Sequence, residues 1–224
     1  MNIGNGQVAE LLLEDGCPYL RVTCPPNLIP TPGQYLLASD GSDSPLPVPL
    51  FYADSAPQGF LAVAPTNAAW SPGRALYLRG PLGRGFTLPS YARRVALVAI
   101  DDAPVRLRGL IQPALKQDAA VVLVSSSAPD TLPDDVEVQP LSALTDILDW
   151  ADYVAFDLSR ENMPPWKDRL RKQNHRMAGM SAQALLRTPV PCGGIAECGV
   201  CAITLKADWR LACKDGPVFD VRDL

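Results

Sequence analysis

The stretch from Cys192 to Cys213, CGGIAECGVCAITLKADWRLAC, constrains its own fold more strongly than any other part of this sequence. Its four cysteines are separated by five, two and eleven residues, with glycines interleaved. A 2Fe–2S cluster needs four converging thiolates, and three closely spaced ligands need a tight loop in which glycine permits positive φ angles. The segment has little hydrophobic periodicity, as expected where a metal centre orders the chain. We therefore predict a 2Fe–2S cluster with these ligands: Cys192, Cys198, Cys201 and Cys213.

Three other interpretations of these cysteines compete with the cluster. Zinc sites favour paired knuckles with two intervening residues, and Cys198 with Cys201 is the only such pair in the sequence. Structural disulfides are disfavoured in a cytosolic protein. Four cysteines within 22 residues also exceed what ordinary buried or catalytic thiols would produce. The spacing favours an iron–sulfur centre and leaves zinc as an alternative.

Composition places the chain among ordinary globular proteins. Of its 224 residues, 47% are hydrophobic and 20% charged, and the net charge is −4. We expect no nucleic-acid partner, because basic residues form no concentrated patch. We expect no membrane span, because no apolar run approaches ~18 residues. The start, Met1-Asn2-Ile3-Gly4, does not resemble a signal peptide, which predicts a cytoplasmic protein.

The first part of the chain predicts β structure. Short apolar alternations at residues 20–23 and 35–37, with further candidate strands at 60–64 and 75–78, are separated by turn residues. Many short strands with frequent turns are typical of a small barrel. We therefore assign residues 1–92 to a β-barrel domain.

The pattern changes near Arg93. Residues 95–100, 120–124 and 153–156 are continuous apolar runs of the kind found in buried parallel strands. Helices are expected between and after these strands, at residues 105–117 (with Pro113 as a disturbance), at 141–150, and from Pro164-Pro165 to about Met177. This alternation predicts an α/β domain over residues 93–180, followed by a cluster-binding segment over 181–224.

Three motifs give the chain a resemblance to a known family. The tail Cys213-Lys214-Asp215-Gly216-Pro217-Val218-Phe219 resembles the last-ligand signature of the dihydroorotate dehydrogenase electron-transfer subunit. Pro32-Gly33-Gln34-Tyr35 resembles the turn into a flavin-barrel strand of that family. Gly80-Pro81-Leu82-Gly83-Arg84-Gly85-Phe86 resembles its junction between barrel and nucleotide domain. The resemblance implies a ferredoxin-reductase-like barrel, a parallel-sheet nucleotide-type domain and a small 2Fe–2S segment.

The resemblance also implies a function and a partner. In this family NADH reduces an FAD bound in the barrel, and electrons then pass singly through the 2Fe–2S cluster to the flavin of a partner subunit. The resemblance therefore implies a hetero-oligomer with a flavin-bearing oxidoreductase subunit.

The flavin motifs of the family are degenerate in this sequence. Where the family has arginine-proline-x-serine or threonine, this chain has Val48-Pro49-Leu50-Phe51. Losing a charge-assisted contact to phosphate costs about 1.5–3 kcal/mol. The second flavin element, a glycine-rich turn ending in threonine, corresponds to residues 64–70, where Thr66 is present without the glycines. The sequence leaves the presence of FAD open.

The nicotinamide motifs are degenerate as well, and NAD(P)H is not expected. The first strand of the α/β domain runs into Asp101-Asp102 where the family has a glycine-rich phosphate-binding turn. Carboxylates repel an anionic ligand, and Asp102 is equally suited to cap a helix. The family's cysteine-glycine-proline is replaced by Asp157-Leu158-Ser159.

These observations favour an oxidoreductase electron-transfer subunit without a complete active site of its own. It would pass single electrons through the 2Fe–2S cluster to or from a partner oxidoreductase. No catalytic residue is assigned, and the lone His175 is expected at the surface or at a helix cap. Two alternatives remain: a complete FAD- and 2Fe–2S-containing NAD(P)H reductase subunit, and a non-redox assembly subunit with a structural metal centre.

Overall fold

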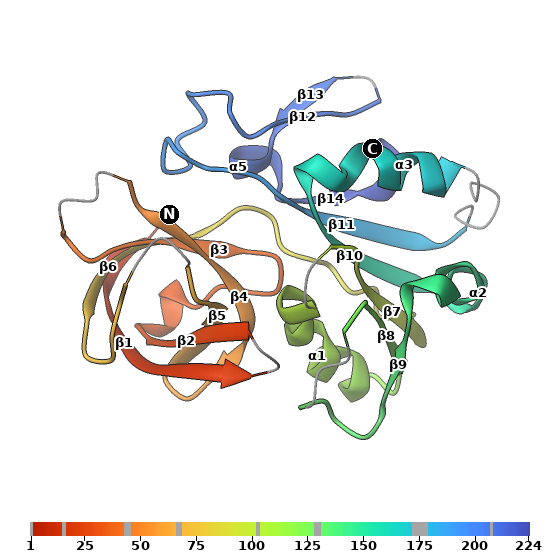
Figure 1. Cartoon of the computed structure of the whole chain (residues 1–224), viewed down its shortest axis with the longest axis horizontal. Coiled ribbons are helices and arrows are strands. Elements are labelled where there is room, and N and C mark those ends of the chain that lie inside the picture. Colours follow the sequence, from red (N-terminus) through yellow and green to blue (C-terminus); the bar gives the residue numbers. More distant parts are fainter. Residues whose placement is uncertain are drawn as a thin grey trace.

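Six antiparallel strands close into a barrel in the order β1-β2-β5-β4-β3-β6 (Figure 1). The computed structural model describes residues 2–14, 17–42, 46–65, 69–101, 104–127, 131–171, 179–206 and 208–224. The barrel strands are β1 (Asn2–Glu14), β2 (Cys17–Thr23), β3 (Tyr35–Ser39), β4 (Val48–Ala56), β5 (Gly59–Val63) and β6 (Ala75–Leu82). A single-turn 3-10 helix, η1 (Pro26–Leu28), precedes β3.

Alternating side chains fill the barrel. Val22, Leu36, Leu50 and Phe60 lie in one buried cluster inside it, as expected where one face of each strand meets the core. Strand β3 is buried on both faces from Tyr35 to Ala38. Its outward face is therefore covered by the C-terminal half of the chain. The four predicted barrel strands are confirmed within β2, β3, β5 and β6.

The second layer is a six-stranded sheet in the order β14-β11-β10-β7-β8-β9. All neighbours are parallel except β14, which pairs antiparallel with β11. The strands are β7 (Arg94–Ala99), β8 (Ala120–Val124), β9 (Val136–Gln139), β10 (Tyr153–Ser159), β11 (Ser181–Arg187) and β14 (Val218–Asp220). The three predicted parallel strands are confirmed, and β10 runs on to Ser159.

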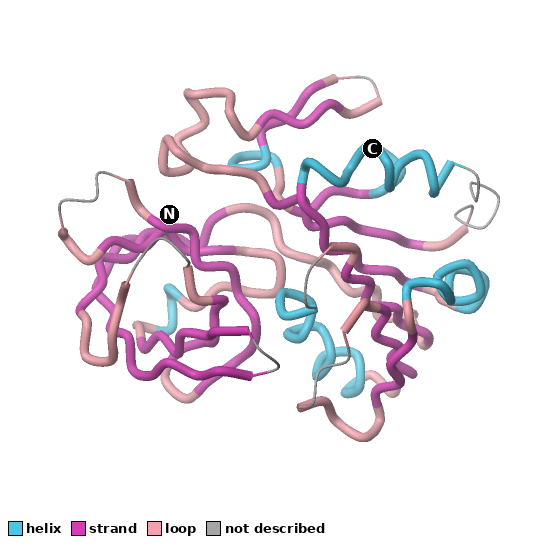
Figure 2. The backbone as a smooth tube through the Cα atoms, viewed as in Figure 1, coloured by secondary structure: helices cyan, strands magenta, loops and turns pink. Residues whose placement is uncertain are grey.

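Helices cover both faces of this sheet (Figures 1 and 2). The 3-10 helix η2 (Pro104–Leu110) and α1 (Ile111–Lys116) share a buried cluster with one face. Helices α2 (Leu144–Trp150) and α3 (Met163–Arg171) share another with the opposite face. Short 3-10 turns precede both, η3 (Leu141–Ala143) and η4 (Arg160–Asn162).

The predicted helices at 141–150 and after Pro164-Pro165 are confirmed, although 172–178 lie outside the described residues. The helical segment predicted over 105–117 is confirmed, and its first half is the 3-10 helix η2. Pro113 lies in the first turn of α1, where a missing backbone N–H costs no hydrogen bond. The α-helix can therefore begin just before this proline.

The C-terminal segment contributes two strands to the sheet. Strands β11 and β14, both from residues 181–224, occupy one side of it, so the sheet extends past residue 180. Between them lie the hairpin β12 (Ala202–Thr204) and β13 (Trp209–Leu211), and the short helix α5 (Ala212–Asp215). A 3-10 turn, η5 (Val221–Asp223), ends the chain. Within the described residues, no helix is both long and apolar enough to cross a membrane.

Candidate iron–sulfur site

The four predicted ligands come from three short pieces of chain that the fold brings together. Cys192 and Cys198 lie in the loop after β11, Cys201 lies just before β12, and Cys213 lies in α5. Cys201 and Cys213 are buried in the hydrophobic cluster that also holds Phe156 of the sheet. Cys192 is half-buried, and Cys198 is exposed. The sheet core therefore anchors one side of the site, and the other side faces solvent.

The four thiols affect one another's pKa values. The Cys198 thiol lowers the pKa of Cys192, whereas the Cys201 thiol raises that of Cys213. A 2Fe–2S cluster held by four cysteines takes two thiolates on each iron. Within the described ranges, no three Cys, His, Asp or Glu side chains are grouped closely enough to hold a metal ion.

The loop between Cys192 and Cys201 turns its backbone amides toward sulfur. Four of its residues have left-handed φ angles: Gly193 (63°), Gly194 (73°), Ala196 (64°) and Gly199 (70°). The first two of these glycines lie within the five-residue spacing between Cys192 and Cys198. Left-handed backbone costs least at glycine, and three of these four positions are glycines.

These amides favour thiolate over thiol at Cys192. Burial acts to raise the pKa of Cys192, but hydrogen bonds from the Cys198 thiol and from the backbone N–H groups of Cys198, Glu197 and Ile195 lower it to about 6. Burial, the Cys201 hydrogen bond and the negative charges of Cys201 and Cys192 raise the pKa of Cys213 to about 12. Neighbouring thiolates repel one another unless a cation lies between them, and iron ions supply that positive charge. The donor set and its amide cradle therefore fit an iron–sulfur cluster.

The loop rests on the outer face of the barrel. A Cβ on Gly193 would lie 3.0 Å from Arg79 Nη2, and a Cβ on Gly194 would lie 3.3 Å from Tyr35 Oη. Sequence reasoning missed both Tyr35 and Arg79 as site residues. Tyr35 was part of a recognised motif, but only the buried outer face of β3 reveals which way its ring points.

The three motifs that carried the family resemblance meet directly beneath this loop. Arg84 N–H donates to Gly216 O at 2.6 Å, and Phe86 N–H donates to Pro32 O at 2.8 Å. Gln34 Nε2 donates to Gly83 O at 3.1 Å. The turn, the domain junction and the cysteine tail therefore form one three-way joint.

The segment from Val48 to Phe51, which aligns with the family's flavin motif, packs within the protein. Val48 and Leu50 are buried inside the barrel, and Phe51 packs against Tyr35 with ring centroids 5.2 Å apart. Val48 and Phe51 therefore stand at the two positions where the family motif has its cation and its hydroxyl group. Thr66 lies outside the described residues. The described part of the motif does not fit FAD.

The nucleotide edge of the sheet holds a network of charges. Arg187, at the end of β11, binds Asp101 Oδ1 through Nη2 and Asp157 Oδ1 through Nε, each at 2.9 Å. Arg106 of η2 approaches Asp157 Oδ2 at 3.3 Å. Dinucleotides bind outside the carboxyl ends of parallel strands, and here these ends are joined to one another. The described residues of this edge do not fit NAD(P)H, and Asp102 lies outside them.

Replacing Arg187 with methionine is expected to lower the free energy of unfolding by about 3 kcal/mol, because it leaves a buried carboxylate short of its partner. Asp157 is only 1% exposed and keeps Arg106 alone. Chemical denaturation would measure the loss. Arg171→Met is the control, because its pair with Asp168 is exposed and should contribute less than ~1 kcal/mol. Equal losses in the two variants would contradict the prediction.

The loss of free energy of unfolding caused by Arg187→Met should become smaller at acidic pH. Burial acts to raise the pKa of Asp101, but hydrogen bonds from Ser159 and Asn162 and the charge of Arg187 lower it below its usual value. A carboxyl group with a lowered pKa stabilises the fold above its unfolded pKa of ~3.9. That contribution disappears as the pH falls through the folded pKa.

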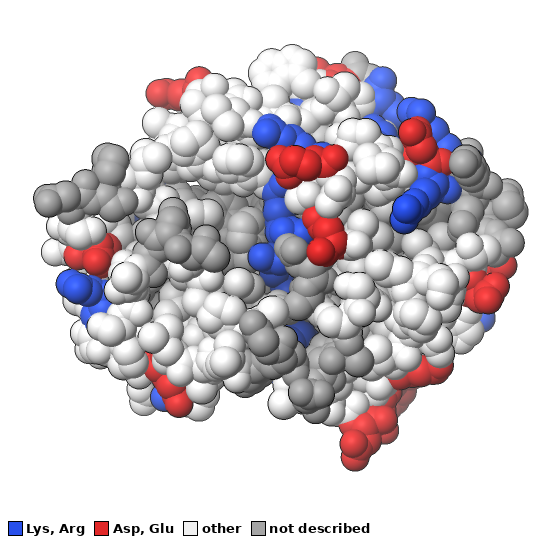
Figure 3. Space-filling view, viewed as in Figure 1, with Lys and Arg blue, Asp and Glu red and all other residues white. Residues whose placement is uncertain are grey.

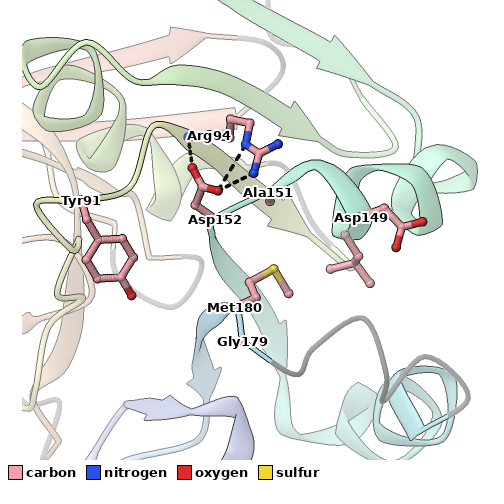
Figure 4. A pocket seen from close by; sticks show the side chains of 8 residues that line it. Tyr91, Arg94, Asp149, Ala151, Asp152, Gly179 and Met180 are labelled. Carbon is pink, nitrogen blue, oxygen red and sulfur yellow. Dashed lines mark hydrogen bonds and ion pairs between the residues drawn. The ribbon is translucent and has the colours of Figure 1, made fainter.

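A shallow pocket lies at the opposite, amino-terminal edge of the sheet (Figure 4). Tyr91, Arg94, Asp152 and Met180 are among the residues that line it. Arg94 donates to Asp152 at 2.6 Å, and this hydrogen bond is the main cause of the lowered pKa of Asp152. The pocket contains none of the four cysteines.

Figure 3 shows charged side chains of both signs gathered in the middle of the face seen in Figure 1.

The fold and the cysteine segment can be compared with known proteins. Residues 192–224 match the iron–sulfur cluster binding domain of dihydroorotate dehydrogenase B. The structure of the NADH-dependent reduced ferredoxin-NADP oxidoreductase has a TM-score of 0.72 at 16% identity, covering 97% of this chain and 88% of that chain. The ferredoxin reductase in carbazole 1,9a-dioxygenase has a TM-score of 0.60 at 17% identity, covering 80% of this chain and 64% of that chain.

Ferredoxin-NADP+ reductase from Plasmodium falciparum gives a TM-score of 0.55 at 10% identity, covering 83% of this chain and 96% of that chain. At such identities these likenesses establish the fold. The predicted fold class and the predicted family resemblance are both confirmed. The chain therefore has a ferredoxin-reductase-like fold, and its residues 192–224 match the iron–sulfur cluster binding domain of dihydroorotate dehydrogenase B.

Proposed function

We propose that this chain is an electron-transfer subunit that passes single electrons through a 2Fe–2S cluster to or from a partner oxidoreductase. The observation that carries the proposal is the match of residues 192–224, which contain all four cysteines, to the iron–sulfur cluster binding domain of dihydroorotate dehydrogenase B. When bound, a 2Fe–2S cluster supplies one-electron transfer. The four cysteines would hold the irons, with Cys201 and Cys213 on the buried side, where water is excluded, and Cys198 on the exposed side.

The electron donor and acceptor would both lie outside this chain. The Val48–Phe51 segment packs as core, and the nucleotide edge is closed by the Arg187 network. Neither feature supports a flavin or a nicotinamide bound here. We infer that the flavin belongs to a partner oxidoreductase subunit, as the dihydroorotate dehydrogenase resemblance implies, in a hetero-oligomer.

Exposed apolar side chains in the cysteine segment support docking of a partner. Ile195, Val200 and Trp209 are 52%, 42% and 61% exposed, and all three lie within the cysteine segment. Exposed apolar groups rimmed by polar residues mark interaction surfaces. A partner that covers them would bring its redox centre close to Cys198. This surface therefore belongs to the proposed electron-transfer function.

Anaerobic purification followed by absorption spectroscopy and analysis of iron, labile sulfide and released small molecules tests this function. We expect a red-brown protein with about two irons and two sulfides per chain, no FAD, and no NADH oxidation by the chain alone. Yellow protein that oxidises NADH unaided would establish a complete reductase instead. Colourless protein free of iron and sulfide would contradict the proposal. A structural centre would be shown if chemical reduction of the cluster left the partner's activity unchanged.

A further inference from the structure

Tyr35 is the barrel residue that lies against the cysteine loop. In β3 it pairs with Phe51 of β4 and with Leu82 of β6. Its neighbour Leu36 points into the barrel core, and successive side chains of a strand point to opposite faces. The Tyr35 ring therefore points outward, yet it is only 1% exposed. What covers it is the loop that holds Cys192 and Gly194, since a Cβ on Gly194 would lie 3.3 Å from Tyr35 Oη.

The hydroxyl group of Tyr35 is buried without a hydrogen-bond partner among the described residues. Buried phenol groups almost always have a partner. Tyr153 shows the usual arrangement, with its hydroxyl donating to Gln183 Oε1 at 2.8 Å. An unpartnered buried donor in a native fold calls for an acceptor that the protein chain does not itself provide.

The position of this hydroxyl group indicates the acceptor. Gly194, whose Cβ position lies 3.3 Å from Tyr35 Oη, follows the predicted ligand Cys192 by two residues. The phenol therefore lies against the loop that carries the predicted ligands. Arg79 places a positive charge on the same face of the barrel, since its Nη2 is 3.0 Å from the Cβ position of Gly193. A neutral O–H group directed at electron-rich sulfur is a hydrogen-bond donor to it.

We propose that the Tyr35 hydroxyl group donates a hydrogen bond to a sulfur atom of the bound 2Fe–2S cluster and thereby raises its reduction potential. This inference rests on the proposed function, because it needs the cluster on the four cysteines. Reduction adds one electron to the cluster and transfers no proton in this proposal. The added negative charge strengthens the hydrogen bond, so the reduced state gains more than the oxidised state. A residue of the barrel then raises the reduction potential of a cluster to which the barrel contributes no ligand.

Gly194 makes this hydrogen bond sterically possible. With a φ of +73°, a side chain there is strained, and its Cβ would lie in tight contact with Tyr35 Oη. Gly194 therefore lets the loop and the phenol approach each other. Because the contact joins β3 to the loop after β11, any movement of the barrel relative to the cluster segment would change the potential.

The test is Tyr35→Phe, which removes the hydroxyl group and keeps the ring. In the anaerobically purified chain carrying its cluster, an EPR-monitored redox titration should show a lower potential. We expect about a tenfold change in the ratio of reduced to oxidised cluster at a fixed potential, or ~59 mV for one electron. Electron–nuclear double resonance after exchange into deuterium oxide should also show the loss of one exchangeable proton coupling. Tyr153→Phe is the matched control, since it also removes a buried hydroxyl group and should leave the potential unchanged.

An unchanged potential and unchanged proton couplings in Tyr35→Phe would overturn the inference, while the intact cluster spectrum would leave the proposed function standing. If the variant fails to fold or to hold its cluster, the wild-type chain labelled with oxygen-17 at its tyrosine hydroxyls decides the question. A coupling between oxygen-17 and the reduced cluster supports the hydrogen bond, and its absence refutes it. A wild-type chain without any cluster would refute both proposals together.

Discussion

Alanine at position 198 is expected to remove almost all visible absorption from the anaerobically purified chain. Each iron of the cluster needs two thiolates, and alanine offers no ligand atom. Cys198 is exposed, so its truncation opens no cavity and any loss of colour reports on ligation. Cys201 would be a poorer choice, because it lies in the hydrophobic core.

The same variant should loosen the C-terminal segment. Binding of a metal centre contributes free energy to folding, so without it the stretch between β11 and β12 should become sensitive to proteases. Absorption spectra, iron analysis and limited proteolysis measure both effects. Cys17→Ala is the control: this half-buried thiol packs near Tyr19 and Ala53, apart from the site, and its loss should leave the colour intact. Full colour in the Cys198 variant would show that the ligand assignment is wrong.

The second large effect is expected from Gly83→Ala, at the joint where the three motifs meet. A Cβ there would lie 2.4 Å from Pro217 Cδ and 2.8 Å from Gly216 O, and the φ of Gly83 is +77°. The left-handed backbone costs an alanine about 1 kcal/mol, and overpacking against rigid backbone adds about 2 kcal/mol. The free energy of unfolding should therefore fall by about 3 kcal/mol, and the melting midpoint by ~6–12 °C.

Thermal unfolding of the cluster-loaded chain, followed by circular dichroism, measures this loss. Gly73→Ala is a matched control, because Gly73 also has a left-handed φ, +88°, but nothing lies within 4 Å of its Cβ position. It should lose only about 1 kcal/mol. The Gly83 variant should also release its cluster more readily, since Cys213 lies just before the clashing residues. Equal melting midpoints for the two variants would show that the joint does not limit stability.

Local pattern predicted the strongest elements well. The run at 120–124 coincides with β8, because a fully buried parallel strand is apolar throughout. Seven strands were not predicted: β1, β4, β9, β11, β12, β13 and β14. Three of them illustrate two different reasons. β9 and β14 are short, so they show little pattern. β11 mixes polar and apolar residues, because its polar side chains are used elsewhere: Gln183 accepts from Tyr153 and Arg187 binds two carboxylates.

By itself, the sequence determined the cysteine loop, the order of the barrel and α/β parts, and the loss of the flavin and nucleotide motifs. These are properties of neighbouring residues, because spacing and glycine placement set the local backbone. Only the tertiary structure decided that Arg187 joins Asp101 and Asp157, and that the Tyr35 hydroxyl group faces the cluster loop. Such contacts join residues far apart in the chain, and their partners are chosen by which faces of the strands the fold buries together.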